Sequence, residues 1–276
     1  MQPKLRFGPA GMPLAMKGRK LAEGIEYTAN EGLNAFEVEF VRGVRGNKED
    51  WAEAKLTAKK NDVLLSCHAP YYINCCSPSK DKQQTSVRNL LQTARAAELL
   101  GAYIIVFHPG YYQGQSPEQA MSRCVSVLRE VIKKMKSEKL HCILGAETTG
   151  KQSAFGSLDE NIKLAKILPE VKPVIDFAHL HARANGSIKS KEDYEKIFDK
   201  IKKELGEDYL KQMHCHFAEI EFTEKGERRH LSLGERWQPD FRQLAKVIKS
   251  KKLMLTIISE SPNLDLDALE MQKLAE

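Results

Sequence analysis

The chain has 276 residues, of which 42% are hydrophobic and 29% charged, and its formal net charge is +6 at pH 7. This composition supplies enough apolar material for a large core and excludes a disordered or collagen-like chain. The sequence shows no apolar run of about 18 residues and no signal-peptide pattern at its N-terminus, so we expect a cytoplasmic protein without a membrane span. The positive charge is compatible with a phosphate-rich partner but is also common in proteins without one.

Eight short runs rich in apolar and β-branched residues predict strands from one end of the chain to the other. In chain order, these strands are Lys4–Gly8, Ala35–Phe40, Val63–His68, Tyr103–His108, His141–Glu147, Pro173–Phe177, Gln212–Phe217 and Leu253–Ser259. Amphipathic stretches with a period of about 3.6 residues lie between many of them and predict helices. The clearest are Thr85–Leu100, Glu118–Lys136, Leu158–Leu168, Lys191–Leu205 and Phe241–Ser250.

This alternation of strands and helices predicts a parallel sheet, because each crossover must return across the sheet. Eight strand–helix units in a chain of this length suit a single TIM (β/α)8 barrel, which typically has about 250 residues. A doubly wound open sheet is the alternative. No linker or change of composition divides the chain, so we expect one domain over residues 1–276.

Four long polar connections interrupt the pattern, namely Gly43–Asp50, Cys75–Gln84, His181–Lys191 and Glu219–Asp240. All but the second follow the end of a predicted strand directly or closely. Connections at the carboxyl ends of barrel strands form the functional face of this fold. We therefore expect the functional site at that end of the barrel.

Histidine and carboxylate side chains recur where the predicted strands end. They are His68, His108, Glu147, Asp176, His179, His214, His216 and Glu260, with Glu227 and His230 in the connection after the seventh strand. Such groups are costly to bury unpaired, and converging carboxylates repel one another unless cations lie between them. Imidazole and carboxylate together suit zinc, manganese or iron, and roughly nine ligands exceed the needs of one tetrahedral ion. We therefore expect two or three divalent metals, which can activate water and clamp the oxygens of a phosphoryl transfer.

The order of these residues resembles the endonuclease IV family of apurinic/apyrimidinic endonucleases. The best match is Asp176-x-x-His179 followed by His230-Leu231-Ser232-Leu233-Gly234-Glu235, and the resemblance runs from about the third predicted strand to the last. It implies a metal-dependent DNA-repair hydrolase that contains two or three zinc ions, with manganese as an alternative. The implied partner is DNA with abasic or damaged sites, and we expect a monomer because the site must wrap around that DNA.

The family's pattern also implies a role for each residue. The first metal would be held by His68, His108 and Glu147, the second by Glu147, Asp176, His214 and Glu260, and the third by His179, Glu227 and His230. Tyr71 would lie beside the flipped abasic nucleotide. The implied reaction cleaves the phosphodiester 5′ to the abasic site and leaves a 3′-hydroxyl, with a metal-bridging hydroxide as the nucleophile and catalytic Glu147 orienting it.

Three features depart from this pattern. Residues 7–11 read Phe-Gly-Pro-Ala-Gly, where the family usually has a histidine near the first strand. The usual Asp-x-His of the third metal site appears as Glu227-Arg228-Arg229-His230, which is one residue wider. His214 and His216 lie on one face of the seventh strand, so either can reach a metal. The resemblance favours His214 as the metal ligand, and His216 would then support that ligand without binding the metal itself.

Other polar residues have two interpretations each. Glu37 and Glu39 alternate on the second predicted strand, where they either line the cavity or form salt bridges with Arg6 or Arg42. The Arg228-Arg229 pair lies in a connection that shares the functional face. These arginines either bind DNA phosphates, which positions DNA without reading its sequence, or remain solvated.

Two other classes of function compete with the nuclease. A metal-dependent sugar isomerase or epimerase of the xylose-isomerase-like barrel group would use one or two metals and two acidic residues, here Glu147 and Glu260. His108, His179 and His230 favour the nuclease, because an isomerase needs few histidine ligands. The third class is a non-catalytic DNA- or metal-binding protein that kept the barrel, and the wider spacing at Glu227 leaves this class open.

Overall fold

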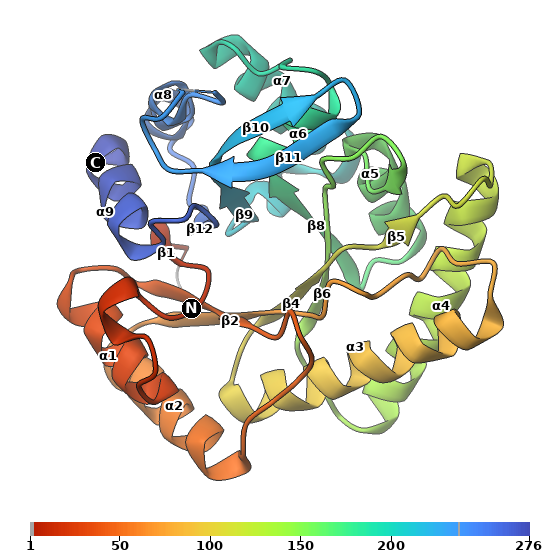
Figure 1. Ribbon diagram of the computed structural model, residues 1–276, viewed down its shortest axis with the longest axis horizontal. Coiled ribbons are helices and arrows are strands. Elements are labelled where there is room, and N and C mark those ends of the chain that lie inside the picture. Colours follow the sequence, from red (N-terminus) through yellow and green to blue (C-terminus); the bar gives the residue numbers. More distant parts are fainter. Residues whose placement is uncertain (1–2, 237) are drawn as a thin grey trace.

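The computed structural model describes residues 3–236 and 238–276. Within these residues, eight parallel strands form a barrel that is surrounded by helices (Figure 1). The barrel strands are β1 (Arg6–Pro9), β2 (Ala35–Glu39), β3 (Leu64–His68), β4 (Ile104–Phe107), β6 (Ile143–Glu147), β8 (Val171–Asp176), β9 (His214–Phe217) and β12 (Thr256–Ser259), in the spatial order β1-β12-β9-β8-β6-β4-β3-β2. The predicted TIM barrel is therefore confirmed, and most of its strands are shorter than the sequence suggested.

Strands β1 and β2 meet to close the barrel. A parallel bridge joins Ala10 and Glu37, and the amide of Gly11 donates a hydrogen bond to the carbonyl oxygen of Glu37 at 2.8 Å. The strands approach so closely that a Cβ atom at Gly8 would overlap the carbonyl oxygen of Ala35. Glycine at position 8 therefore permits the closure.

Helices cover the outside of the barrel. They are α1 (Leu21–Asn30), α2 (Lys48–Lys60), α3 (Lys80–Leu100), α4 (Pro117–Ser137), α5 (Leu158–Ile167), α7 (Lys191–Leu205), α8 (Phe241–Lys251) and α9 (Asp265–Ala275), with 3-10 turns at Leu14–Met16 and Glu207–Leu210. The start of α4 is fixed by a capping box, in which the Gln119 amide donates to the Ser116 hydroxyl at 3.3 Å and the Ser116 amide donates to the Gln119 side chain at 3.1 Å. In the part of the chain that is described, no helix is both long and apolar enough to cross a membrane.

Several segments differ from the sequence prediction. The connection Glu219–Asp240 contains a hairpin of β10 (Glu219–Thr223) and β11 (Gly226–Leu231), which forms a separate antiparallel sheet and appears in blue in Figure 1. Phe177, predicted as the end of a strand, instead begins the short helix α6 (Phe177–Arg183). The predicted connections at 43–50 and 75–84 run into α2 and α3. A second small sheet pairs β5 (Gly110–Tyr111) with β7 (Ala154–Phe155).

The core explains why the functional residues face inward. Between the strands and the surrounding helices, the ring of Phe217 on β9 packs against Phe177, the first residue of α6, and against Phe241, the first residue of α8. Inside the barrel, Val106 and Val174 are fully buried in one apolar cluster. Because side chains alternate along a strand, Asp176, two positions beyond Val174, also points inward. The apolar interior thus gives way to polar side chains at the carboxyl ends of the strands.

Candidate metal centre

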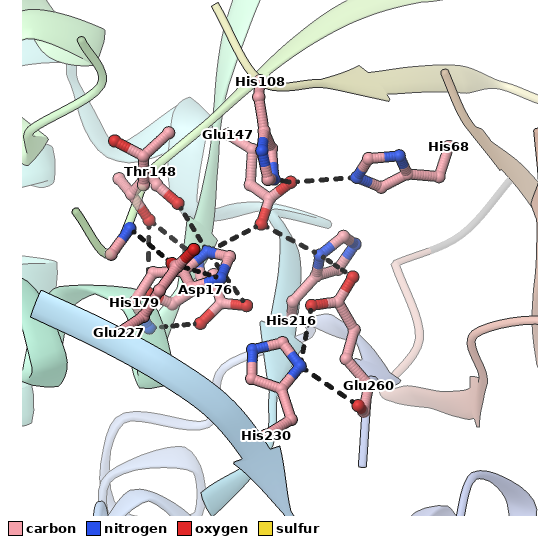
Figure 2. Close-up of polar contacts among 12 residues, drawn as sticks. His68, His108, Glu147, Thr148, Asp176, His179, His216, Glu227, His230 and Glu260 are labelled. Atoms are coloured by element: carbon pink, nitrogen blue, oxygen red, sulfur yellow. Dashed lines mark hydrogen bonds and ion pairs between the residues drawn. The ribbon is translucent and has the colours of Figure 1, made fainter. Parts of the chain in front are cut away.

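Glu147, the last residue of β6, lies at the centre of the polar cluster (Figure 2). Its carboxylate is fully buried. The Oε2 atom lies 3.1 Å from His68 Nε2 and 3.0 Å from His108 Nε2. The Oε1 atom lies 3.1 Å from His179 Nδ1 and 3.5 Å from His216 Nδ1. One carboxylate therefore joins imidazoles from four segments of the barrel.

The Asp176-x-x-His179 motif is a helix cap. Asp176 ends β8, and its Oδ1 atom accepts a hydrogen bond from the amide of His179 at 2.6 Å, which starts α6. The turn folds the His179 ring back so that its Nδ1 atom lies 2.9 Å from the carbonyl oxygen of Thr148 and 3.4 Å from Asp176 Oδ2. The spacing of three residues thus brings a carboxylate and an imidazole to the same point in the barrel.

Glu260 connects the barrel to the β10–β11 hairpin. Its Oε1 atom lies 3.1 Å from Nδ1 of His216, which belongs to β9. Its Oε2 atom lies 3.8 Å from Nδ1 of His230, which belongs to β11 (Figure 2). The hairpin therefore adds a histidine to a cluster that is otherwise built on the barrel strands and α6.

Three sets of residues in this cluster have the geometry of a metal site, since the ligand atoms of each set lie within 4.8 Å of one another. The sets are His68, His108 and Glu147; then Glu147, Asp176, His216 and Glu260; and then Asp176, His179, His230 and Glu260. Glu147 Oε1, Asp176 Oδ2 and His216 Nδ1 are buried and form no hydrogen bond with described residues. Orphaned acceptors of this kind fit divalent metal ions, and mixed nitrogen and oxygen donors suit zinc or manganese.

The two histidines of β9 occupy different depths. His214 Nε2 lies 3.0 Å from Glu37 Oε2, and its Nδ1 lies 2.7 Å from the hydroxyl of Tyr103. His216, one pleat further along, lies level with Asp176, its register partner on β8. The geometry therefore favours His216 over His214 as the residue beside the second metal set.

Glu227 lies near the third set but outside it. Its Oε2 atom is 3.2 Å from His179 Nε2 and accepts a hydrogen bond from the amide of Gly150 at 3.1 Å. Lys151 Nζ lies 3.7 Å from its other oxygen. The wider spacing between Glu227 and His230 still brings both side chains against His179, although the ligand atoms do not all converge within one short radius.

Charge balance within the cluster shifts its pKa values. Burial disfavours ionised Glu147, but His108 and His216 outweigh this and hold the pKa of Glu147 well below its usual value. Burial also disfavours charged His68, whereas the hydrogen bond with Glu147 raises the pKa of His68 to about 10. Burial raises the pKa of Asp176 to about 6. A metal bound here would displace protons from imidazoles, so metal affinity should increase with pH.

A cavity of about 420 Å³ lies over the cluster and is lined by His68, His108, His179, His230 and Glu260. The three predicted substrate residues, Tyr71, Arg228 and Arg229, also line it. Tyr71 is 55% exposed. Arg228 and Arg229 form ion pairs of 2.9 and 2.7 Å with Glu221 on β10. All three side chains are thus available to a molecule that enters the cavity.

Sequence reasoning left the role of Glu37 open and missed Tyr103. Arg6, one of the two salt-bridge partners considered for Glu37, pairs with Asp62 at 2.8 Å. Glu37 faces His214 and His216 at the level below the cluster. The sequence did indicate an inward position for Glu37, because side chains alternate along β2 and this one falls on the inner face.

Comparisons with known proteins agree with this architecture. A family model described as a xylose isomerase-like TIM barrel matches residues 25–275. An uncharacterized protein of Methanocaldococcus jannaschii is 38% identical over 269 residues, which cover 98% of this chain and 96% of that protein. A probable endonuclease 4 of Aquifex aeolicus is 27% identical over 195 residues, which cover 70% of this chain and 68% of that protein.

Solved structures of two kinds share the fold. Endonuclease IV from Thermus thermophilus superposes with a TM-score of 0.73 at 19% identity, and the match covers 96% of this chain and 98% of that one. D-Psicose 3-epimerase from Clostridium cellulolyticum superposes with a TM-score of 0.68 at 14% identity, covering 97% and 98% of the two chains. At these identities the likeness shows the fold alone.

Proposed function

This chain belongs to the xylose isomerase-like TIM barrel family, and from that premise we propose that it is a DNA-repair endonuclease. It would hydrolyse the phosphodiester 5′ to an abasic site with a centre of two or three zinc ions. The observation that carries the proposal is the number of histidines around the shared carboxylates. His108, His179 and His230 extend the cluster beyond what one metal can use. The similarity to probable endonuclease 4 sequences supports the same assignment.

The proposed ligands of the first two ions are those of the first two sets, so that His216 replaces the expected His214. The third ion departs from the third set, because Asp176 and Glu260 are assigned to the second ion and Glu227 takes their place. The first ion would be held by His68, His108 and Glu147, the second by Glu147, Asp176, His216 and Glu260, and the third by His179 and His230 with Glu227 as the acidic partner. When bound, the ions would activate water and stabilise the negative charge that develops on the leaving oxygen.

The remaining steps belong to the side chains of the chain itself. Glu147 would orient the attacking oxygen, because its buried carboxylate lies at the centre of the cluster. Arg228 and Arg229 would exchange Glu221 for DNA phosphates, which position the duplex without reading its sequence. Tyr71, exposed at the rim of the cavity, would contact the extruded abasic nucleotide. We propose that the protein acts on DNA in the cytoplasm as a monomer.

One observation favours a second function, that of a sugar epimerase or isomerase. The set Glu147, Asp176, His216 and Glu260 by itself provides four ligands for a single ion. Its two glutamates face each other across His216 and could exchange protons with a bound sugar. The fold similarity to a D-psicose 3-epimerase adds to this alternative. An enzyme of this kind would need one ion and no contribution from the hairpin.

A nicking assay separates the two functions. The substrate is a duplex labelled at one 5′ end that carries a single tetrahydrofuran abasic analogue, and the control is the same duplex without the analogue. We expect the zinc-loaded protein to cut only the first duplex, on the 5′ side, and to leave a 3′ end that a DNA polymerase extends. An intact duplex with fully metal-loaded protein would overturn the nuclease. Interconversion of ketoses by the same preparation would establish the epimerase instead.

A further inference from the structure

A second polar layer lies beneath the metal cluster, deeper in the barrel, and Glu37 on β2 is its centre. Glu37 is fully buried. Its Oε2 atom accepts a hydrogen bond from the hydroxyl of Ser66 at 2.7 Å and lies 3.0 Å from His214 Nε2. Its Oε1 atom lies 2.9 Å from His216 Nε2. A carboxylate from one strand therefore contacts two imidazoles from another strand across the barrel.

An ionised carboxylate only accepts a hydrogen bond, so His214 carries its proton on Nε2, which bonds to Glu37 Oε2. His216 Nε2 lies 2.9 Å from Glu37 Oε1 without the alignment of a hydrogen bond. A proton on this Nε2 is still favoured, because an unprotonated nitrogen would face the carboxylate oxygen with its lone pair. A neutral His214 then has a free lone pair on Nδ1. Tyr103 supplies the matching donor, since its hydroxyl lies 2.7 Å from that atom. The chain of donors thus runs from Tyr103 through His214 to Glu37.

The same reasoning fixes the orientation of His216. Its Nε2 proton faces Glu37, so its Nδ1 atom carries the lone pair. That atom lies 3.1 Å from Glu260 Oε1 and 3.5 Å from Glu147 Oε1, and the ring is fully buried. A lone pair directed at two carboxylates is unfavourable unless a cation lies between them. The second polar layer therefore holds His216 in the tautomer whose Nδ1 atom can bind a metal.

We propose that Glu37 is a positioning residue that holds His216 with its Nδ1 atom toward the metal, supported from behind by His214 and Tyr103. A histidine ligand generally donates its other N–H to a carboxylate or carbonyl, which sets the tautomer and the ring orientation. This inference rests on the metal centre of the proposed function but not on its DNA substrate. It also explains why β9 carries two histidines when only one faces the cluster.

The test measures metal binding in the absence of DNA. Glu37→Gln replaces one accepting oxygen by an NH2 group, so the new side chain cannot accept from both imidazoles. We expect this variant to lose about 10- to 100-fold in zinc affinity, measured by competition with a chromophoric chelator. The matched control is Glu98→Gln, which breaks an exposed carboxylate–histidine pair with His141 at 3.3 Å and should leave zinc affinity unchanged. A folded Glu37→Gln protein with wild-type affinity would overturn the proposal.

Imidazole ¹⁵N spectra of the wild-type zinc protein give a second readout that does not depend on any variant folding. We expect His216 to show a metal-bound Nδ1 and a protonated Nε2. A metal-bound Nε2 would overturn the proposal, since Glu37, His214 and His216 would then themselves hold an ion, as the spacing of their ligand atoms within 4.8 Å allows. A protein with the expected spectra that fails to nick abasic DNA would refute the proposed nuclease and leave the role of Glu37 intact.

Discussion

The Nε2 atom of His179 lies 3.2 Å from the Oε2 atom of Glu227, and this contact joins helix α6 to the β10–β11 hairpin. Glu227 is the residue at which this chain departs from the spacing of endonuclease IV. Its carboxylate nevertheless reaches the histidine that would share a metal with it. Substitution of Glu227 therefore tests the proposed third metal site directly.

We expect Glu227→Ala to lower the zinc content by about one ion per chain. Asp176 and Glu260 are assigned to the second ion, so His179 and His230 alone would offer too few ligands for a tight third site. The other ions should remain, since their ligands lie on the barrel strands or directly after them. Elemental analysis after extensive desalting measures the difference. Glu224→Ala, at an exposed position near the tip of the same hairpin, should retain the full content. Equal metal content in both variants would exclude Glu227 from the centre.

Glu147→Gln should abolish most of the nicking activity, by at least about 100-fold, because the amide cannot replace the charge of the carboxylate. The variant keeps the size and shape of the side chain, so circular dichroism should show a folded barrel. The comparison is of initial rates on the abasic duplex at saturating zinc. A folded variant that cuts at nearly the wild-type rate would remove Glu147 from its proposed role.

Arg229→Ala should weaken DNA binding equally for all sequences, because its proposed contact is with phosphate. Loss of one phosphate contact reduces the slope of log K against log salt by about one. Fluorescence anisotropy with an abasic duplex at several salt concentrations measures the slope. Lys59→Ala, which removes an exposed charge from the end of α2, should not change it. An unchanged slope for Arg229→Ala would show that Arg229 does not contact DNA.

Asp193 offers a test of stability against pH. Its Oδ2 atom accepts hydrogen bonds from the amides of Lys189 and Ser190, both at 3.1 Å, and its Oδ1 lies 2.9 Å from Lys196 Nζ. The hydrogen bond from Lys196 is the largest influence that lowers the pKa of Asp193 from 3.8 to about 2. Because the folded-state pKa is the lower one, the stabilisation is present above about pH 4 and is lost as pH falls through about 2.

Asp193→Ala should therefore lower the free energy of unfolding by about 0.5 to 1 kcal/mol at pH 7. The difference from wild type should shrink in urea titrations repeated at progressively lower pH. Asp193→Asn keeps an accepting oxygen and should lose less. A deficit for Asp193→Ala that does not change with pH would show that its charge contributes nothing.

Much of the barrel could be predicted because many of its strands lie in short runs rich in apolar residues. Residues 104–107 read Ile-Ile-Val-Phe, and α4 begins at the Ser116-Pro117 signal and continues with an amphipathic pattern. Helix α2 was missed because it buries only Ala54 and Ala58, and two alanines make no visible apolar stripe. The β10–β11 hairpin was missed because most of its residues are polar. Its pairing depends on backbone hydrogen bonds, which sequence patterns do not reveal.

The positions of the candidate ligands could be predicted only as far as alternation along a strand allows. Period two puts His214 and His216 on the same face but does not say which reaches the end of the barrel. The answer depends on strand register, which aligns His216 with Asp176 and with Ile258, while His214 aligns with Thr256. Register is set by the packing of the whole barrel, so a local pattern cannot supply it. The partner of Glu37 was unpredictable for the same reason.

The β10–β11 hairpin has a consequence for how this protein could diversify. Among the described residues it forms its own small sheet, outside the ladder of the barrel, yet it carries Glu227, Arg228, Arg229 and His230 in one continuous stretch. An exchange of this single stretch between relatives would change the ligands of the proposed third metal and the charge beside the cavity at the same time. The eight barrel strands would keep every backbone hydrogen bond. A new chemistry could thus be acquired by recombination of about a dozen residues on an unchanged scaffold.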